Sequence, residues 1–250
     1  MIDERLLEVA ANSLASALAA QEGGARRVEL CTALEAGGLT PSPAQIALAR
    51  ERLRIPLYVL IRPRAGDFLY SDLECEVMSR DIEACAALGC DGVVLGVLDA
   101  DAGVDMARCR ALIAAAGRMG VTFHRAFDVS RDQHQALEDV IALGCERVLT
   151  SGAQATALDG AARIRALIAQ ADGRLIVMPG AGIDARNIAA LATATGATEL
   201  HASAKRQWPS GMRRQHPWMP EFQDGEWRSD AGQVRDMVAA LAADEAGPAR

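Results

Sequence analysis

The chain has 250 residues, half of them apolar, with a formal net charge of −7 and a pI near 5.2. A chain of this length can bury a large core, and its basic residues are scattered among acids, which argues against nucleic-acid binding. No apolar run approaches the roughly 18 to 20 residues that span a bilayer, and the N-terminus is acidic, so the sequence predicts a cytoplasmic protein with no membrane partner.

Eight short apolar or β-branched runs alternate with helical stretches along nearly the whole chain. The predicted strands are 6–10, 27–31, 57–62, 92–98, 121–127, 147–151, 175–178 and 199–203. The first helix starts at Ser13 and stops at Gly23-Gly24, and Ser42-Pro43 opens the second. The later helices are predicted at 73–88, 105–116, 132–143, 157–171, 187–195 and 230–243.

A strand followed by a crossover helix, repeated eight times, predicts an α/β fold of the (β/α)8 class, a TIM barrel with eight parallel strands. We expect one domain over 1–250, with a long loop at 206–229 before the last helix. That loop holds all three tryptophans, which favours a lid or a subunit contact over disorder. The six cysteines form no CxxC pair, so we expect free thiols.

In such barrels the active mouth lies at the carboxyl ends of the strands. Glu8 lies in the first predicted strand, and Glu29 and Cys31, two residues apart in the second, share one face. An acid among apolar neighbours is costly to bury unless it is paired, so we expect Glu29 to meet an arginine or a histidine inside the barrel. An ion pair that only fills the core is the alternative.

The third predicted strand runs into a segment at 62–72 that is dense in donors and acceptors. Arg62 and Arg64 flank a proline and could form a fork for a carboxylate or a phosphate. Gly180, Gly182 and Ser203 follow the seventh and eighth strands, the usual phosphate site of this fold. These five residues are the predicted anion-binding set; a solvated loop is the alternative for 62–72.

Strand five carries His124, Arg125 and Asp128, and strand eight carries His201. Alternation along a strand predicts that only one of His124 and Arg125 faces the barrel interior. A histidine near carboxylates can act as a general base or a metal ligand, and a hydrogen-bonded core histidine is its rival. Together with Glu8 and Glu29, these four residues form the predicted catalytic set.

With these residues identified, the chain resembles the copper homeostasis protein CutC family. The matching stretches are VELC at 28–31, GGLTPS at 37–42, the loop at 62–72, TFHRAFD at 122–128, RVLTSG at 147–152 and MPGAG at 178–182. The resemblance implies a cytoplasmic (β/α)8 protein, often oligomeric, that handles copper through cysteines at the ends of the first two strands. Cys31 matches the second cysteine, whereas Ala10 stands at the first, and Ala65 replaces a usual glycine.

Three hypotheses follow. The first is a CutC-like protein of copper homeostasis with a weak Cu(I) site centred on Cys31, because cuprous ion prefers soft thiolate and thioether donors. The second is an enzyme acting on a small phosphorylated or carboxylated metabolite, with Glu29 or His124 as the proton-transfer group. The third is an interaction protein that docks through 206–229. We expect a homo-oligomer, with a dimer favoured, and no motif indicates a nucleotide cofactor.

Overall fold

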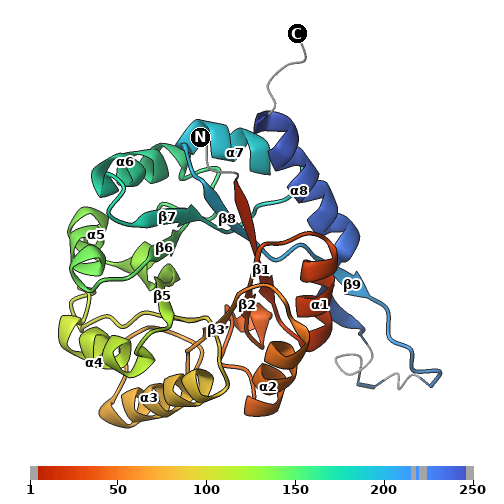
Figure 1. Ribbon diagram of the computed structural model, residues 1–250, viewed down its shortest axis with the longest axis horizontal. Helices are drawn as coiled ribbons and strands as arrows, with labels where there is room; N and C mark the ends of the chain where they lie inside the picture. Colours follow the sequence, from red (N-terminus) through yellow and green to blue (C-terminus); the bar gives the residue numbers. More distant parts are fainter. Residues whose placement is uncertain (1–4, 215–217, 220–223, 246–250) are drawn as a thin grey trace.

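In the computed structural model, which describes residues 5–214, 218–219 and 224–245, eight parallel strands form a barrel surrounded by helices (Figure 1). Each strand pairs with its sequence neighbour, β1 also pairs with β8, and an isolated bridge between Gly180 and His201 joins the last two strands. The (β/α)8 prediction is therefore confirmed. The strands are β1 Leu6–Ala11, β2 Arg27–Leu30, β3 Leu57–Leu60, β4 Gly92–Leu95, β5 Gly120–Phe123, β6 Arg147–Thr150, β7 Ile176–Pro179 and β8 Glu199–Ala202.

Helices cover the outside of this barrel and follow the predicted positions closely. The first three begin where the sequence supplies a capping side chain: Ser13 accepts a backbone hydrogen bond at α1, Ser42 does so at α2, and Ser71 forms a capping box with Glu74 at α3. The helices are α1 Leu14–Glu22, α2 Pro43–Arg52, α3 Asp72–Ala87, α4 Met106–Ala116, α5 Gln133–Ala142, α6 Ala161–Ala171, α7 Ile188–Thr195 and α8 Ala231–Glu245.

Side chains alternate between the two faces of every strand, which separates an outer apolar core from a mostly polar interior. Leu7 and Val9 of β1 pack outward against the helices, while Glu8 faces inward. A small inner apolar cluster contains Cys31, Tyr58, Leu60 and Val94. The predicted shared face of Glu29 and Cys31 is confirmed, because both side chains line the same interior cavity.

The segment predicted as a loop at 206–229 differs from that expectation at both of its ends. Strand β9 (Lys205–Trp208) pairs antiparallel with β10 (Glu226–Ser229), and the ribbon projects beyond α1 and α8 (Figure 1). Arginines on both strands stack on the Trp208 ring, which stabilises the pairing. Residues 215–217 and 220–223 of this segment lie outside the described residues.

Among the residues that the structure describes, no helix has both the length and the apolar character that a bilayer crossing requires. The cysteines agree with the sequence prediction, since all six are free thiols.

Candidate functional site

A cavity of about 430 Å³ opens at the carboxyl ends of the strands, inside the barrel. Its walls combine apolar side chains with polar groups that converge on one space, an arrangement typical of a small-molecule site. The polar lining residues are Glu29, Cys31, Arg62, His124, Arg125, His201, Ser203 and Lys205. The predicted convergence of distant strand ends on one polar cup is thus present for these residues.

Three buried side chains form a chain of contacts at the base of this cavity. The imidazole of His201 lies between two acids: its Nδ1 is 2.8 Å from Glu8 Oε1 and its Nε2 is 3.4 Å from Glu29 Oε2. Strand pairing brings these residues together, because Glu8 on β1 is the register partner of His201 on β8, and β1 is also paired with β2. The buried Glu29 is therefore next to a histidine, which agrees with the expectation that it meets an arginine or a histidine inside the barrel.

The surroundings shift the pKa values of Glu8, Glu29 and His201 in different directions. Burial alone would raise the pKa of Glu8, but the charge of Arg27 and the hydrogen bond from His201 outweigh it and hold that pKa at about 2. Burial raises the pKa of Glu29 to about 7, with the Glu8 charge adding to the effect and His201 and Arg27 opposing it. Burial would lower the pKa of His201, yet the Glu8 hydrogen bond and both carboxylates raise it. Between about pH 2 and pH 7, the two carboxyls that contact this imidazole therefore differ in protonation, with Glu8 ionised and Glu29 neutral.

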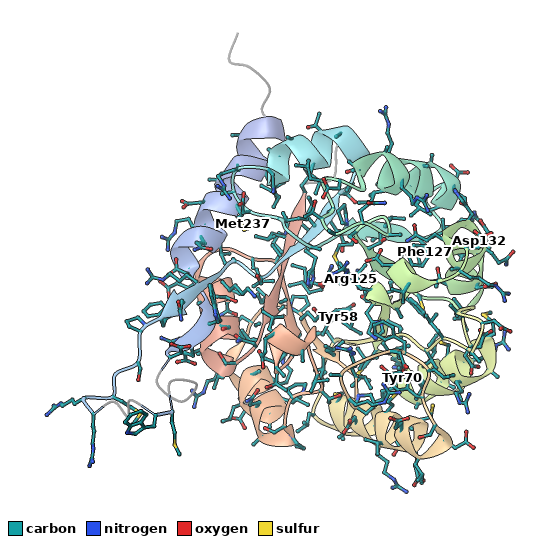
Figure 2. The ribbon with its side chains drawn as sticks, turned by 180° about the vertical axis from the view of Figure 1, so that it is seen from behind. Tyr58, Tyr70, Arg125, Phe127, Asp132 and Met237 are labelled. Carbon is teal, nitrogen blue, oxygen red and sulfur yellow. The ribbon has the colours of Figure 1, made fainter. Side chains whose placement is uncertain are left out.

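Beneath this chain lies a paired ionic layer that the sequence analysis did not assign. Arg27 contacts both Glu8 and Glu199, and Arg147 lies 3.1 Å from Glu199. Both guanidiniums also stack on Tyr58, which lies near the barrel axis (Figure 2). Arg27, Arg147 and Glu199 each open a strand, and that position was the available signal for an inward-facing charge.

His124 and Arg125 both line the cavity, so the prediction that only one of them faces inward is wrong. Strand β5 ends at Phe123, and a 3-10 turn from Arg125 to Val129 follows, which breaks the alternation. The His124 Nδ1 accepts a hydrogen bond from the backbone N–H of Ala126 at 3.2 Å. Burial, aided by the charge of Arg62, lowers the pKa of His124 to about 3. His124 is therefore a neutral imidazole near pH 7 and a poor general base.

The two predicted fork arginines separate. Arg62 is buried and lines the cavity, donating to the carbonyls of Ala36, Gly38 and Gly66. Arg64 lies outside the cavity lining, because its guanidinium binds Glu74 and other acceptors of its own loop and is 37% exposed. The expected two-arginine fork is therefore not formed, and of these two arginines only Arg62 faces the cavity.

The remaining predicted residues divide between the cavity and its support. Gly182 and Ser203 line the cavity, whereas Gly180 lies outside the lining and its N–H donates to the carbonyl of Thr150. Asp128 also lies outside it: the carboxylate accepts from the backbone N–H groups of Ser151 and Ala153 and pairs with Arg125 at 2.7 Å. These contacts give Asp128 a positioning role for Arg125, which Figure 2 shows near the barrel axis.

The metal-ligand atoms at the barrel mouth determine whether a copper ion fits there. Cys31 is the only thiol of the described cavity lining, and burial strongly raises its pKa, which favours the protonated form over the thiolate that binds Cu(I). Ala10 lines the same cavity and carries no donor. The described part of the chain has one other group of possible metal ligands: an oxygen of Glu8, an oxygen of Glu29 and a nitrogen of His201, all within 4.8 Å of one another. Its carboxylate oxygens are hard ligands, which Cu(I) does not prefer. This donor set does not fit a tight Cu(I) site.

Comparison with known proteins identifies the family. A model of the CutC family matches residues 5–206. The chain belongs to the CutC family. Curated CutC family proteins are similar over most of their length: that of Xylella fastidiosa (strain Temecula1) is 60% identical, covering 94% of this chain and 88% of the relative, and that of Bacteroides fragilis is 50% identical, covering 83% of each.

Solved structures agree with this assignment. A CutC structure from Streptococcus agalactiae, named for copper homeostasis, is 33% identical, has a TM-score of 0.77 and covers 80% of this chain and 98% of its own. An aldolase named QR15 has a TM-score of 0.62 at 17% identity, covering 81% of this chain and 92% of its own, so that likeness concerns the fold alone.

Proposed function

We propose that this CutC family protein serves copper homeostasis in the cytoplasm and that it binds Cu(I) weakly through Cys31 at the barrel mouth. The family and the name of the Streptococcus agalactiae relative support the role. The observation that carries the site is the Cys31 side chain, which lies directly after β2 and lines the same cavity as Ala10. Because a single protonated thiol must lose its proton to bind, we expect low affinity that increases with pH.

Titration with Cu(I) in competition with a chromophoric chelator tests this proposal. Cys31→Ala should abolish the weak binding, and Ala10→Cys should strengthen it at least tenfold, since the new thiol would line the same cavity. Cys75→Ala, a partly exposed thiol on α3, is the matched control and should bind as the wild type does. Equal Cu(I) binding by wild type and Cys31→Ala would contradict the proposal.

A second candidate function is an enzyme acting on a small carboxylated or phosphorylated metabolite. The observation that favours it is the state of Glu29: the carboxyl lines the cavity, no described residue donates it a well-aligned hydrogen bond, and its pKa is raised to about 7 by burial. A group with such a pKa is suited to proton transfer at neutral pH. The low pKa of His124 leaves Glu29 as the better of the two predicted proton-transfer groups.

A thermal-shift screen with small carboxylates and phosphate esters tests the second candidate. A ligand should stabilise the wild type by mass action, and Arg62→Gln should weaken that shift because it removes a cavity cation. Arg80→Gln, on the exposed surface of α3, is the control for charge alone. Equal shifts in wild type and Arg62→Gln would argue against the cavity as the anion site.

We also propose that the protein forms a homodimer through the β9–β10 ribbon. Trp218, between the two strands, is 83% exposed, and Trp227 of β10 is 49% exposed. Exposed aromatic rings are enriched in protein–protein interfaces. Light scattering on the whole chain and on a variant without residues 206–229 tests this. A dimer that persists without the ribbon would place the interface elsewhere.

A further inference from the structure

Helix α3 ends in a turn that holds two cysteines against each other. The N–H of Cys90 donates to the carbonyl of Cys85 at 3.0 Å, and the N–H of Gly89 donates to the carbonyl of Ala86 at 3.1 Å. With Gly89 at φ +75°, these two bonds define a Schellman motif, in which side chains at the positions of Cys85 and Cys90 contact each other. Covalent bond lengths and the first hydrogen bond limit the separation of the two Cα atoms to roughly 6 Å, within the range that a disulfide spans.

The two thiols also interact directly. A side-chain hydrogen bond joins the sulfurs, and it raises the pKa of Cys85 and lowers that of Cys90, so Cys85 is the donor. The charge of Arg50 lowers the Cys90 pKa further, whereas burial and the Asp91 carboxylate oppose that shift. Burial and the charges of Cys90 and Asp81 add to the increase at Cys85. Cys90 is therefore the thiol that more readily becomes a thiolate, the reactive form of cysteine.

The pair lies at the end of the barrel opposite to the cavity. Cys90 comes just before β4 begins at Gly92, at the amino end of that strand, whereas the cavity opens at the carboxyl ends. Cys90 is 7% exposed and Cys85 is fully buried. A small oxidant that approaches from solvent therefore meets Cys90 first, and the Cys85 thiol lies directly behind it.

Two other helices end in the same motif and show that it does not need two cysteines. At the end of α1 the equivalent residues are Ala20 and Ala25, joined by a backbone hydrogen bond of 3.0 Å, and at the end of α5 they are Val140 and Cys145, joined at 3.4 Å. Cys145 is 5% exposed, close to the value for Cys90, but burial raises its pKa to about 12. Cys145 is thus a matched single thiol within the same chain.

We propose that Cys85 and Cys90 form a reversible disulfide when the protein meets a hydroperoxide, which makes this turn a redox modification site. The Cys90 thiolate attacks one peroxide oxygen, the O–O bond breaks, and the other oxygen leaves as water or an alcohol after it takes up a proton. The Cys85 sulfur then attacks the sulfenic acid of Cys90, the S–O bond breaks, and the hydroxyl leaves with the Cys85 proton as water. Two electrons pass from the thiols to the peroxide, and a dithiol reductant returns them by thiol–disulfide exchange.

Mass spectrometry of the whole chain, treated with hydrogen peroxide and then alkylated, tests this proposal. Cleavage after Arg80 and Arg108 releases a peptide of residues 81–108, whose only cysteines are Cys85 and Cys90. We expect this peptide to lose two hydrogen atoms and to resist alkylation until dithiothreitol is added. The peptide that contains Cys145 should remain a thiol under the same treatment.

Cys85→Ser separates the disulfide from simple oxidation of one thiol, because serine keeps a hydroxyl donor for Cys90 but cannot resolve its sulfenic acid. Dimedone should trap that sulfenic acid at least about tenfold more in the variant than in the wild type. In Cys90→Ser, Cys85 should remain a thiol, and Cys145→Ser, the control, should form the disulfide as the wild type does. Urea unfolding verifies that each variant is folded.

A measurement on the unaltered chain covers the case in which a variant fails to fold. Iodoacetamide should alkylate Cys90 at least about tenfold faster than Cys145 at pH 7, despite their similar exposure. Equal alkylation rates overturn the proposal. So do a peptide 81–108 that keeps both thiols after peroxide treatment and a disulfide that joins two chains, because the turn predicts a bond within one chain.

Discussion

Replacing Glu29 by glutamine should stabilise this protein at alkaline pH. The folded chain holds a proton on Glu29 up to about pH 7, whereas an unfolded chain releases it near the ordinary pKa of 4.5. Between these values the folded state binds more protons than the unfolded state, so the free energy of unfolding falls as pH rises. At about 1.36 kcal/mol for each pH unit, the difference amounts to about 3 kcal/mol by pH 8.

The assay is urea unfolding followed by tryptophan fluorescence at pH 5, 6.5 and 8. Glu29→Gln removes the titration without changing the side-chain volume, so the variant should exceed the wild type by less than about 1 kcal/mol at pH 5 and by up to about 3 kcal/mol at pH 8. Glu83→Gln is exposed on α3 and should change the free energy of unfolding by less than about 0.5 kcal/mol at either pH. Equal destabilisation of Glu29→Gln at both values would refute the reasoning, because it would mean that Glu29 is ionised and paired throughout.

Three further substitutions probe the support of the site. Glu8→Gln should lower the free energy of unfolding in urea by about 3 kcal/mol at neutral pH, because the folded-state pKa of Glu8 is about 2. The wild type should lose this stability as pH falls from 4.5 toward 2, and the variant should not. The substitution should also lower the pKa of His201 measured by NMR, because Glu8 raises that pKa. Gly38→Ala should cost about 1–3 kcal/mol in the same assay, since φ is +86° and the new Cβ would lie 2.6 Å from Leu60 Cδ2. Asp128→Asn should cost about 1–3 kcal/mol in thermal unfolding, because two backbone donors lose a charged acceptor; an unchanged melting temperature would argue against its positioning role.

The alternation of eight apolar runs with helical stretches was enough to predict the fold, and the period of two along each strand predicted part of the mouth. It placed Glu29 and Cys31 on one interior face and placed His201 at the carboxyl end of the last strand. It did not predict that β1 pairs with β8 in the register that sets Glu8 opposite His201, because barrel closure joins residues 193 positions apart. The contact between these two residues is a property of the tertiary structure.

Alternation also failed where strands ended earlier than the apolar pattern suggested. The run at 121–127 contains Phe127, which is buried, yet the strand stops at Phe123 because His124 caps a 3-10 turn through its own ring nitrogen. Arg64 was misplaced for a similar reason, since the chain turns after β3 and the loop's own acceptors bind its guanidinium. A side-chain capping interaction of this kind leaves no periodic signal in a sequence.

The buried charged residues inside this barrel are of two kinds: some stabilise the fold by pairing with one another, and Glu29 does not. Arg27, Glu199 and Arg147 are buried as mutually paired ions, and removal of one partner would leave an uncompensated charge, so their retention needs no functional explanation. Glu29 differs, because its ionisation in place opposes folding by about 3 kcal/mol above pH 7, and a glutamine of equal size would avoid that cost. A residue that destabilises the fold while facing a cavity indicates a functional requirement. We expect Glu29→Gln to raise the free energy of unfolding at pH 8 and Arg27→Met to lower it. That pair of results would show that, on one strand, Arg27 stabilises the fold and Glu29 does not.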